Sequence, residues 1–425
     1  MPRRHWRRGI ACFWATLTAS MLLAATGSHA ASEISPTTQA TASNAGWLAY
    51  APAPAVAGAV CLVDTGVNLN SDTQSAVTAR TALDGGVPDD VDHDAHHGTR
   101  MAMIMAAARN GTGMVGAWPA LRVVSVRAAA PPPAGQEPAF YYTAYDRAIR
   151  TCTDLSTPAA PIMAVELAVG SREAPSQTEA DTMAEYVALA HADNVSVIAA
   201  AGNEGGPVSA PASLPGVVGV AAGDQHGVLC EGSSRGVGVD VIGPGCDLDS
   251  VDPVTLAPEA GWWGTSQASA FTAAVLTALR SYKPTLTWAQ GEQLLTSTTK
   301  AGMLDVAAAF RAAGLGSVVD AGLRAMPKPP PPPVKAWAAP KVRSASYRRG
   351  VLRVRLASTP KGARVKLDVF WRVRGGRVRK AKTLYTTMTT IQTHLAKRPV
   401  KLALAFRDAK VKQHDSKTTA VRISR

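Results

Sequence analysis

Cysteine is scarce in this sequence. The chain has five cysteines among 425 residues, and no two of them are spaced as a C-x-x-C pair, which argues against a structural zinc site. Cys12 lies in the N-terminal segment described next, so four remain, and four cysteines allow three disulfide connectivities. We favour Cys230 with Cys246, because they flank one short segment, and Cys61 with Cys152 as the other pair.

Long apolar runs are absent after the N-terminus, so the rest of the chain offers no transmembrane span. The N-terminus joins the basic stretch MPRRHWRRG to the apolar stretch IACFWATLTASMLLAAT and to the small residues SHA before Ala31. This order is typical of a secretory signal peptide. We therefore expect residues 1–30 to be a cleaved signal, with a retained membrane anchor as the alternative. The mature protein is then secreted or held at the cell envelope, where disulfides persist.

Basic residues are few in the first three quarters of the chain, and acidic residues are few in the last. Residues 31–325 hold 14 Lys and Arg against 28 Asp and Glu, a net charge of −14, whereas residues 341–425 hold 24 against 3, a net charge of +21. This asymmetry predicts two modules with different partners. Between them, the proline run of residues 326–340 predicts a semi-rigid spacer. Residues 31–45, rich in Ser, Thr and Ala, are expected to form a flexible lead.

The acidic module, residues 46–325, alternates apolar runs with helical patterns. The runs VAGAVCLVDTG, LRVVSVRA, APIMAVELAVG, NVSVIAAAGN and GVVGVAAG predict buried strands. The stretches YYTAYDRAIRTC and TEADTMAEYVALAHAD predict helices between them. Strands that are apolar throughout and separated by helices indicate an α/β fold with a doubly wound, mostly parallel sheet that is covered on both faces.

The basic module has a different periodicity. The runs VLRVRLAS, RVKLDVFWRVR and PVKLALAF alternate strictly, which places their apolar side chains on one face and basic side chains such as Arg353 and Arg355 on the other. The pair Gly375–Gly376 predicts a hairpin turn between two of these runs. We expect a small all-β antiparallel sandwich of the immunoglobulin-like or fibronectin-like kind.

Four short motifs of the acidic module place polar side chains beside predicted elements. DTG puts Asp64 at the carboxyl end of a strand, the edge at which parallel sheets place their sites, and HGT puts His97 at a helix start. AAGN puts Asn203 after another strand, and GTSQA puts Ser266 at a helix N-terminus, where the dipole favours negative charge. Singly, a turn residue or a helix cap accounts for each of them. Together they offer the hydroxyl, base, carboxylate and oxyanion donor that serine catalysis needs.

In chain order, DTG, HGT, AAGN and GTSxA resemble the motifs of the subtilisin-like serine protease family, and the likeness extends over roughly residues 47–314. The resemblance implies that Ser266 is the nucleophile, His97 the general base and Asp64 its orienting carboxylate. It also implies that Asn203 donates to the oxyanion, together with the backbone N–H of Ser266. The implied activity is that of an exported serine endopeptidase, which acts on protein or peptide substrates through an acyl-enzyme and requires no cofactor.

The strand VELAVG departs from the family's usual NMSLG. Glu166 and Ala168 stand where the family has Asn and Ser beside the substrate-binding groove, which Gly170 also borders. A carboxylate at Glu166 could select a basic substrate side chain, pair internally or mark weakened activity, and we favour internal pairing. Arg100 and Met103 also replace residues that are usual in the family. These departures motivate an alternative function, a catalytically weakened subtilisin-like scaffold that binds peptides or envelope polymers.

Two acidic stretches raise the question of a metal site. DVDHDAHHG crowds Asp92, His93, Asp94 and His96 together, but a solvated acidic loop is the preferred interpretation, and only His97 precedes Gly-Thr. A longer run supplies hard oxygen ligands without matching a calcium-loop signature. It comprises Asp84, Asp89, Asp90, Asp92 and Asp94. We therefore assign no metal ligand, and calcium stays open.

The charge of residues 341–425 exceeds what solubility requires, and it indicates an anionic partner. Export favours a cell-envelope polymer, an acidic polysaccharide or anionic lipid headgroups over nucleic acid. The acidic module of the same chain is a further candidate partner.

Overall fold

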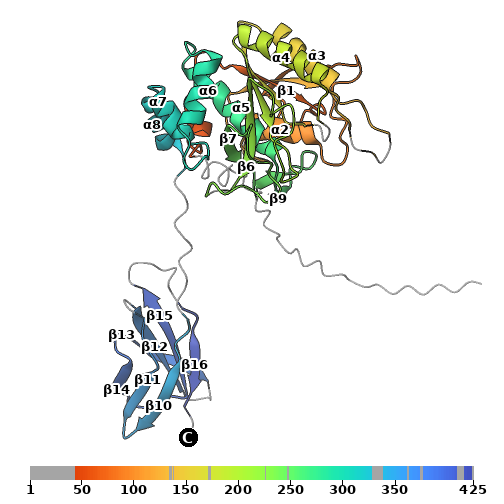
Figure 1. Cartoon of the computed structure of the whole chain (residues 1–425). Helices are drawn as coiled ribbons and strands as arrows, with labels where there is room; N and C mark the ends of the chain where they lie inside the picture. The colour runs from red at the N-terminus through yellow and green to blue at the C-terminus, as the bar shows by residue number, and fades with distance from the viewer. Residues whose placement is uncertain are drawn as a thin grey trace, which may run out of the picture. The chain divides into compact units, whose positions relative to one another are not determined.

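The chain divides into two compact units, with the division between Met326 and Pro327 (Figure 1). The predicted signal peptide, nearly all of the flexible lead, most of the proline spacer and the turn Gly375–Gly376 lie outside the described residues. The computed structural model describes residues 44–133, 136, 138–170, 174–224, 226–246, 248–327, 338–360, 363–373, 377–408 and 416–423.

A seven-stranded sheet forms the centre of the first unit. Its strands lie in the order β2-β3-β1-β4-β5-β6-β7, and each neighbouring pair is parallel. All five predicted strands are present, and the doubly wound α/β class is confirmed. The seven strands are β1 (Ala59–Asp64), β2 (Val77–Ala82), β3 (Arg122–Arg127), β4 (Ile162–Leu167), β5 (Ser196–Ala200), β6 (Val217–Gly223) and β7 (Val241–Pro244).

Helices cover both faces of this sheet because the side chains of each strand alternate. In β1, Val60 and Leu62 pack in the apolar cluster that includes α2 and α5, whereas Cys61 and Val63 pack in the cluster that includes α3 and α4. Among the described helices, none is both long and apolar enough to cross a bilayer. The helical segments are η1 (Leu48–Tyr50), α2 (His97–Ala106), α3 (Tyr142–Asp154), α4 (Gln177–Ala192), α5 (Thr265–Tyr282), α6 (Trp288–Ser297), α7 (Val306–Ala312) and α8 (Gly316–Ala325).

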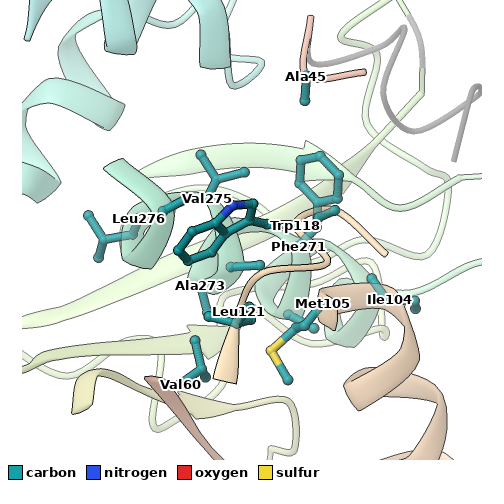
Figure 2. Packing of buried hydrophobic residues seen from close by; sticks show 14 of the residues in the cluster. Ala45, Val60, Ile104, Met105, Trp118, Leu121, Phe271, Ala273, Val275 and Leu276 are labelled. Atoms are coloured by element: carbon teal, nitrogen blue, oxygen red, sulfur yellow. The ribbon is translucent and has the colours of Figure 1, made fainter. Parts of the chain in front are cut away.

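Helix α5 is the central helix of the first unit, and every residue from Thr265 to Ser281 is buried. Its many alanines leave little bulk between the helix and the sheet, so the helix can pack closely on the strands. Figure 2 shows the Trp118 ring among Phe271, Val275 and Leu276 of this helix, which all belong to one buried cluster. Burial along its length holds α5 in place, and this positions the side chains at its N-terminal end.

An antiparallel hairpin lies directly before α5 in the chain. It consists of β8 (Leu248–Val251) and β9 (Pro258–Trp262), with a turn in which Asp252 Oδ1 accepts hydrogen bonds from the backbone N–H groups of Val254 and Thr255. This hairpin, which leads the chain into Ser266, was not predicted from the sequence.

Two disulfides lie in the first unit. Cys61 of β1 is bonded to Cys152 of α3, with 5.7 Å between their Cα atoms, and Cys230 is bonded to Cys246, with 5.8 Å. The predicted pairing is therefore confirmed. The first bond joins the strand that ends in Asp64 to a helix that covers the sheet.

The second unit is a sandwich of two antiparallel sheets. Apolar residues of both sheets, including Leu352 and Val354 on one and Val365 and Leu367 on the other, form a single buried cluster. The predicted small all-β sandwich is thus confirmed. One sheet, in the order β10-β11-β14, contains β10 (Val342–Arg348), β11 (Val351–Leu356) and β14 (Thr390–His394). The other, in the order β13-β12-β15-β16, contains β12 (Ala363–Arg372), β13 (Val378–Thr386), β15 (Lys401–Asp408) and β16 (Thr419–Arg422).

Candidate active site

Asp64 and His97 form a hydrogen-bonded pair at the carboxyl edge of the parallel sheet. Asp64 is the last residue of β1 and is fully buried, and His97 is the first residue of α2. His97 Nδ1 lies 2.8 Å from Asp64 Oδ1 and 3.0 Å from Oδ2. Since a carboxylate only accepts, Nδ1–H donates to it, and Nε2 of the neutral ring is left to accept a proton.

The two residues after this histidine tie α2 to the turn that follows β1. A side chain at Gly98 would collide with the backbone carbonyl of Gly66, so only glycine lets the helix start this close to the turn. Thr99 Oγ1 donates to Asp90 Oδ2 at 2.6 Å, and Thr65 Oγ1 donates to Asp90 Oδ1 at 2.8 Å. The Gly-Thr that follows the histidine is therefore needed to hold the imidazole beside its carboxylate.

The surroundings of His97 favour its protonated form. Burial by itself lowers the pKa of His97, but the charge and the hydrogen bond of Asp64 outweigh burial, and Asp90 contributes in the same direction as Asp64. The net effect raises the pKa of His97 above its ordinary value of 6.5. A histidine whose imidazolium is stabilised in this way is suited to take a proton from a hydroxyl during attack.

Ser266 is the second residue of α5 and is largely buried, with 8% of its surface exposed. Its hydroxyl donates to the backbone carbonyl of Ala168 at 2.6 Å, and in the described part of the chain it makes no hydrogen bond with His97. The hydroxyl proton must therefore turn toward His97 Nε2 before the oxygen can act as a nucleophile. Catalytic hydrogen bonds are often loose without substrate and tighten in the complex.

Asn203 lines the same cavity as Ser266, and its amide group has a fixed orientation. Its Oδ1 accepts hydrogen bonds from the backbone N–H of Thr265 at 2.9 Å and from Thr265 Oγ1 at 3.0 Å. Because a backbone N–H can only donate, the oxygen of the amide must face Thr265, which leaves Nδ2 as the end that can donate elsewhere. The backbone N–H of Ser266 lies in the first turn of α5, where amides have no intrahelical acceptor. These are the two donors that an oxyanion would need.

A cavity of about 720 Å³ lies next to these groups. His97, Asn203 and Ser266 all line it, and Asp64 lies behind His97, away from the cavity. Ala168 and Gly170, the other two residues proposed to border the substrate-binding groove, form part of its wall. The remaining wall is made by Thr65, Val91, Asp92, His93, Asp94, Ala95, Pro132, Pro133, Gln136, Pro138, Ala139, Phe140 and Val169.

Glu166 does not line this cavity. Its side chain is fully buried between the sheet and α5, where Oε1 lies 2.6 Å from Ser269 Oγ, within hydrogen-bond distance. The expectation that this carboxylate contacts a substrate is therefore corrected, because the strand turns it toward the helix rather than toward the groove. Internal pairing, the favoured interpretation, describes what the structure shows. The partner, Ser269, was not predicted from the sequence.

Arg100 joins the histidine helix to the hairpin before Ser266. It is 5% exposed, and its Nη1 lies 2.8 Å from Glu259 Oε2 and donates to the carbonyl of Val251 at 2.9 Å. Its guanidinium group also stacks 3.8 Å from the ring of Trp262. The sequence marked Arg100 as a departure from the family but did not reveal these partners. The turn at Asp252 was the signal that could have shown the hairpin.

The aspartates that offered oxygen ligands do not form a calcium cage. Asp84 pairs with Arg127, Asp89 pairs with Arg80, and Asp90 accepts the hydrogen bonds that fix the start of α2. Over the described ranges, no group of three or more His, Cys, Asp or Glu side chains has an arrangement that could hold a metal ion.

A model of the subtilase family matches residues 57–316, which is more than half of the chain. This range contains every residue of the candidate active site described above. The chain belongs to the subtilase family. This confirms the resemblance stated from the four motifs.

Named relatives of this subtilase are distant. The chain is 31% identical over 218 residues to an extracellular protease of Xanthomonas campestris pv. campestris, an alignment that covers 48% of this chain and 36% of the relative. It is 28% identical over 244 residues to subtilisin DY of Bacillus licheniformis, covering 56% and 82%. The chain thus spans about a third of the first relative's length and most of the second's.

A solved structure supports the fold. Proteases from Pseudoalteromonas arctica PAMC 21717 superpose with a TM-score of 0.54 at 22% identity, covering 66% of this chain and 95% of that one.

Proposed function

We propose that this subtilase is a serine endopeptidase that hydrolyses peptide bonds through an acyl-enzyme on Ser266. The observation that carries the proposal is the Asp64–His97 pair, with contacts of 2.8 and 3.0 Å, at a cavity that Ser266 and Asn203 also line.

The reaction follows from the roles of these groups. His97 Nε2 takes the hydroxyl proton as Ser266 Oγ attacks the substrate carbonyl, and Asp64 stabilises the imidazolium that results. Asn203 Nδ2 and the backbone N–H of Ser266 donate to the oxyanion. The imidazolium then gives its proton to the leaving amine, and a water molecule, activated by the same imidazole, hydrolyses the acyl-enzyme.

The backbone from Ala168 to Gly170 supplies the surface on which an extended peptide would lie. These residues follow β4 at the cavity wall, and Ser266 already donates to the Ala168 carbonyl. Pairing of a peptide with a strand uses main-chain hydrogen bonds, so it does not depend on the side chains that differ from the family pattern.

Labelling with a serine-directed fluorophosphonate tests the proposal. The full chain should label, and Ser266→Ala should not. Ser297→Ala is the matched control, because Ser297 is a helical serine on α6 whose hydroxyl donates to the carbonyl of Gln293. The control should label like the unchanged chain. If neither the unchanged chain nor the control labels, the endopeptidase proposal is wrong and the weakened, peptide-binding scaffold takes its place.

We also propose that the protein is exported, with cleavage before Ala31. The basic and apolar stretches at the N-terminus support this, and so do two disulfides, which persist outside the cytoplasm. N-terminal sequencing of the mature protein is the test. A chain that begins at Ala31 supports cleavage, and one that keeps the apolar stretch supports the anchor.

The second unit is proposed to bind an anionic envelope polymer, such as an acidic polysaccharide. Arg353 and Arg355 are exposed on one face of β11, where their neighbours across the sheet are exposed polar residues. On the other sheet, Asp368 lies 3.6 Å from Lys366 and 3.8 Å from Lys380, which offsets part of the charge there. Arg353 and Arg355 have no acidic residue opposite them on either neighbouring strand, so their charge is available to a polyanion.

Salt elution from an immobilised acidic polysaccharide tests this binding with the full chain. The double variant Arg353→Gln and Arg355→Gln should elute at lower salt, because fewer counterions are released on binding. Lys366→Gln with Lys380→Gln removes the same charge from the other sheet and should change elution less. If both double variants shift elution equally, the binding depends on net charge alone and not on the face that carries Arg353 and Arg355. If the unchanged chain is retained more tightly on duplex DNA than on the polysaccharide, the partner is a nucleic acid instead.

A further inference from the structure

A third buried carboxyl group lies beside the proposed catalytic pair. Glu166 is fully buried on β4, and its Oε1 lies 2.6 Å from Ser269 Oγ, one helical turn after the proposed nucleophile. Ser269 Oγ also lies 3.0 Å from the backbone carbonyl of Ser266. The other oxygen of Glu166, Oε2, has no hydrogen-bond partner.

The number of protons that Glu166, the Ser269 hydroxyl and the Ser266 carbonyl share indicates whether Glu166 is ionised. A hydroxyl has one proton, and the carbonyl of Ser266 can only accept. If Glu166 were ionised, Ser269 would have one proton for two acceptors, and one close pair of oxygens would have no proton between them. A proton on Glu166 removes this conflict, because Glu166 then donates to Ser269 Oγ, and Ser269 donates to the carbonyl of Ser266.

The charge of the surroundings agrees with this count. Within the described residues no Lys or Arg forms an ion pair with Glu166, and an unpaired charge is very costly at a buried site. The titratable groups that face it are Asp64 from β1 and His97 from α2. Its register neighbour on β5 is the apolar Ile198, and α5 contributes the uncharged Ser269.

We infer that Glu166 is a positioning residue that carries a proton and, through Ser269, holds the Ser266 carbonyl and the first turn of α5 in place. The consequence for catalysis rests on the proposed function, in which Ser266 is the nucleophile. When Glu166 is protonated, β4 places no full negative charge near His97, and Asp64 is the carboxylate that stabilises the imidazolium.

Burial supports this assignment. It raises the pKa of Glu166 well above its usual range, and the nearby Asp64 raises it further, against the opposing effects of the Ser269 hydrogen bond and of His97. The direction of this shift agrees with the proton count, because burial and Asp64 both favour the neutral carboxyl group.

Three variants test whether Glu166 acts as a hydrogen-bond donor or as a negative charge. Glu166→Gln keeps a donor toward Ser269 and should retain kcat within about threefold. Glu166→Leu removes the donor, and Ser269→Ala removes the link, so each should lower kcat about tenfold, the scale of one lost hydrogen bond, with a smaller change in KM. A fall in Glu166→Gln as large as in Glu166→Leu, or failure of Glu166→Gln to fold, would overturn the inference.

The pH profile gives a second readout. With Glu166 already neutral, Glu166→Gln should leave the acid limb of kcat/KM where it is in the unchanged chain. If Glu166 were ionised, removing its charge would lower the pKa of His97 and move that limb to lower pH. Such a movement would contradict the inference.

An infrared measurement does not depend on activity. The carbonyl stretch of a protonated carboxyl group should appear at neutral pH in the unchanged chain and be lost in Glu166→Gln. If the band is present but no serine labels, the proton assignment stands and the proposed function fails. If serine labels but no such band is lost, the proposed function stands and this inference fails.

Discussion

Replacing Asp64 by asparagine tests the proposed catalytic pair most directly. The asparagine side chain would keep the shape of the aspartate and could still accept the hydrogen bond that the backbone N–H of Thr65 gives to Oδ1 at 2.6 Å. Its amide group would then face His97 Nδ1 and donate to it. Nδ1 would become the acceptor, the ring proton would move to Nε2, and Nε2 could no longer take the hydroxyl proton of the proposed nucleophile.

The size of the effect follows from the balance at His97. Burial lowers the pKa of His97, and Asp64 is the largest of the influences that raise it. Two unit charges at 4 Å interact by about 4 kcal/mol at an effective dielectric constant of 20, which corresponds to about 3 pKa units. Without Asp64, burial should prevail, and the pKa of His97 should fall from above 6.5 to below it. The wrong tautomer should also reduce kcat by about four orders of magnitude.

The assay is the pH dependence of fluorophosphonate labelling, together with titration of the His97 ring protons by NMR. In the unchanged chain, labelling should fall as pH drops through the raised pKa of His97, because protonation removes the base. Asp89→Asn is a matched control, since Asp89 is an exposed carboxylate paired with Arg80, and it should change neither readout. If His97 titrates at the same pH with and without Asp64, the charge of Asp64 does not control the base and the reasoning is refuted.

Three further changes test the framework around the site. Arg100→Met removes the guanidinium contacts to the hairpin and should cost about 3 kcal/mol in the free energy of unfolding, measured by urea denaturation, with reduced labelling of the proposed nucleophile. Replacing both Cys61 and Cys152 by Ala opens a cross-link between residues 91 apart and should cost about 4 kcal/mol in the same assay. Burial raises the pKa of Glu292 from 4.5 to about 7, so the folded state binds this proton more tightly. Stability should therefore fall as pH rises through this window, by at most about 3 kcal/mol, and Glu292→Gln should abolish that fall.

The five inner strands of the sheet were predictable from the sequence, whereas the two edge strands, β2 and β7, were not. The apolar runs of β1 and β4 have no polar interruption except the site residue Glu166, because helices cover both of their faces. β2 (Val77–Ala82) was not predicted, since it is an edge strand whose side chains are all partly or fully exposed and whose sequence, VTARTA, shows no apolar run. The hairpin β8–β9 was missed for a related reason, because Pro258 and Gly261 lie within its second strand.

The site was predictable as far as residue identity, but not as far as hydrogen-bond direction. Motif order was enough to select Asp64, His97, Asn203 and Ser266, and the fold brings them to one cavity. The Ser266 hydroxyl donates to the Ala168 carbonyl because of the rotation of one side-chain bond, and no sequence pattern predicts that rotation. The direction of such a hydrogen bond can be found only from a three-dimensional structure.

The departures from the family pattern bear on whether the site is weakened. Arg100 and Glu166 are each a poor choice for a buried position when considered alone, because each takes a charged or polar group out of water. In the structure each has a partner far along the chain: Arg100 pairs with Glu259, and Glu166 with Ser269. Both partners lie on the segment that carries Ser266, so both departures act on the position of the proposed nucleophile. Because each departure is accommodated by a contact with that segment, neither Arg100 nor Glu166 by itself argues for the silent scaffold.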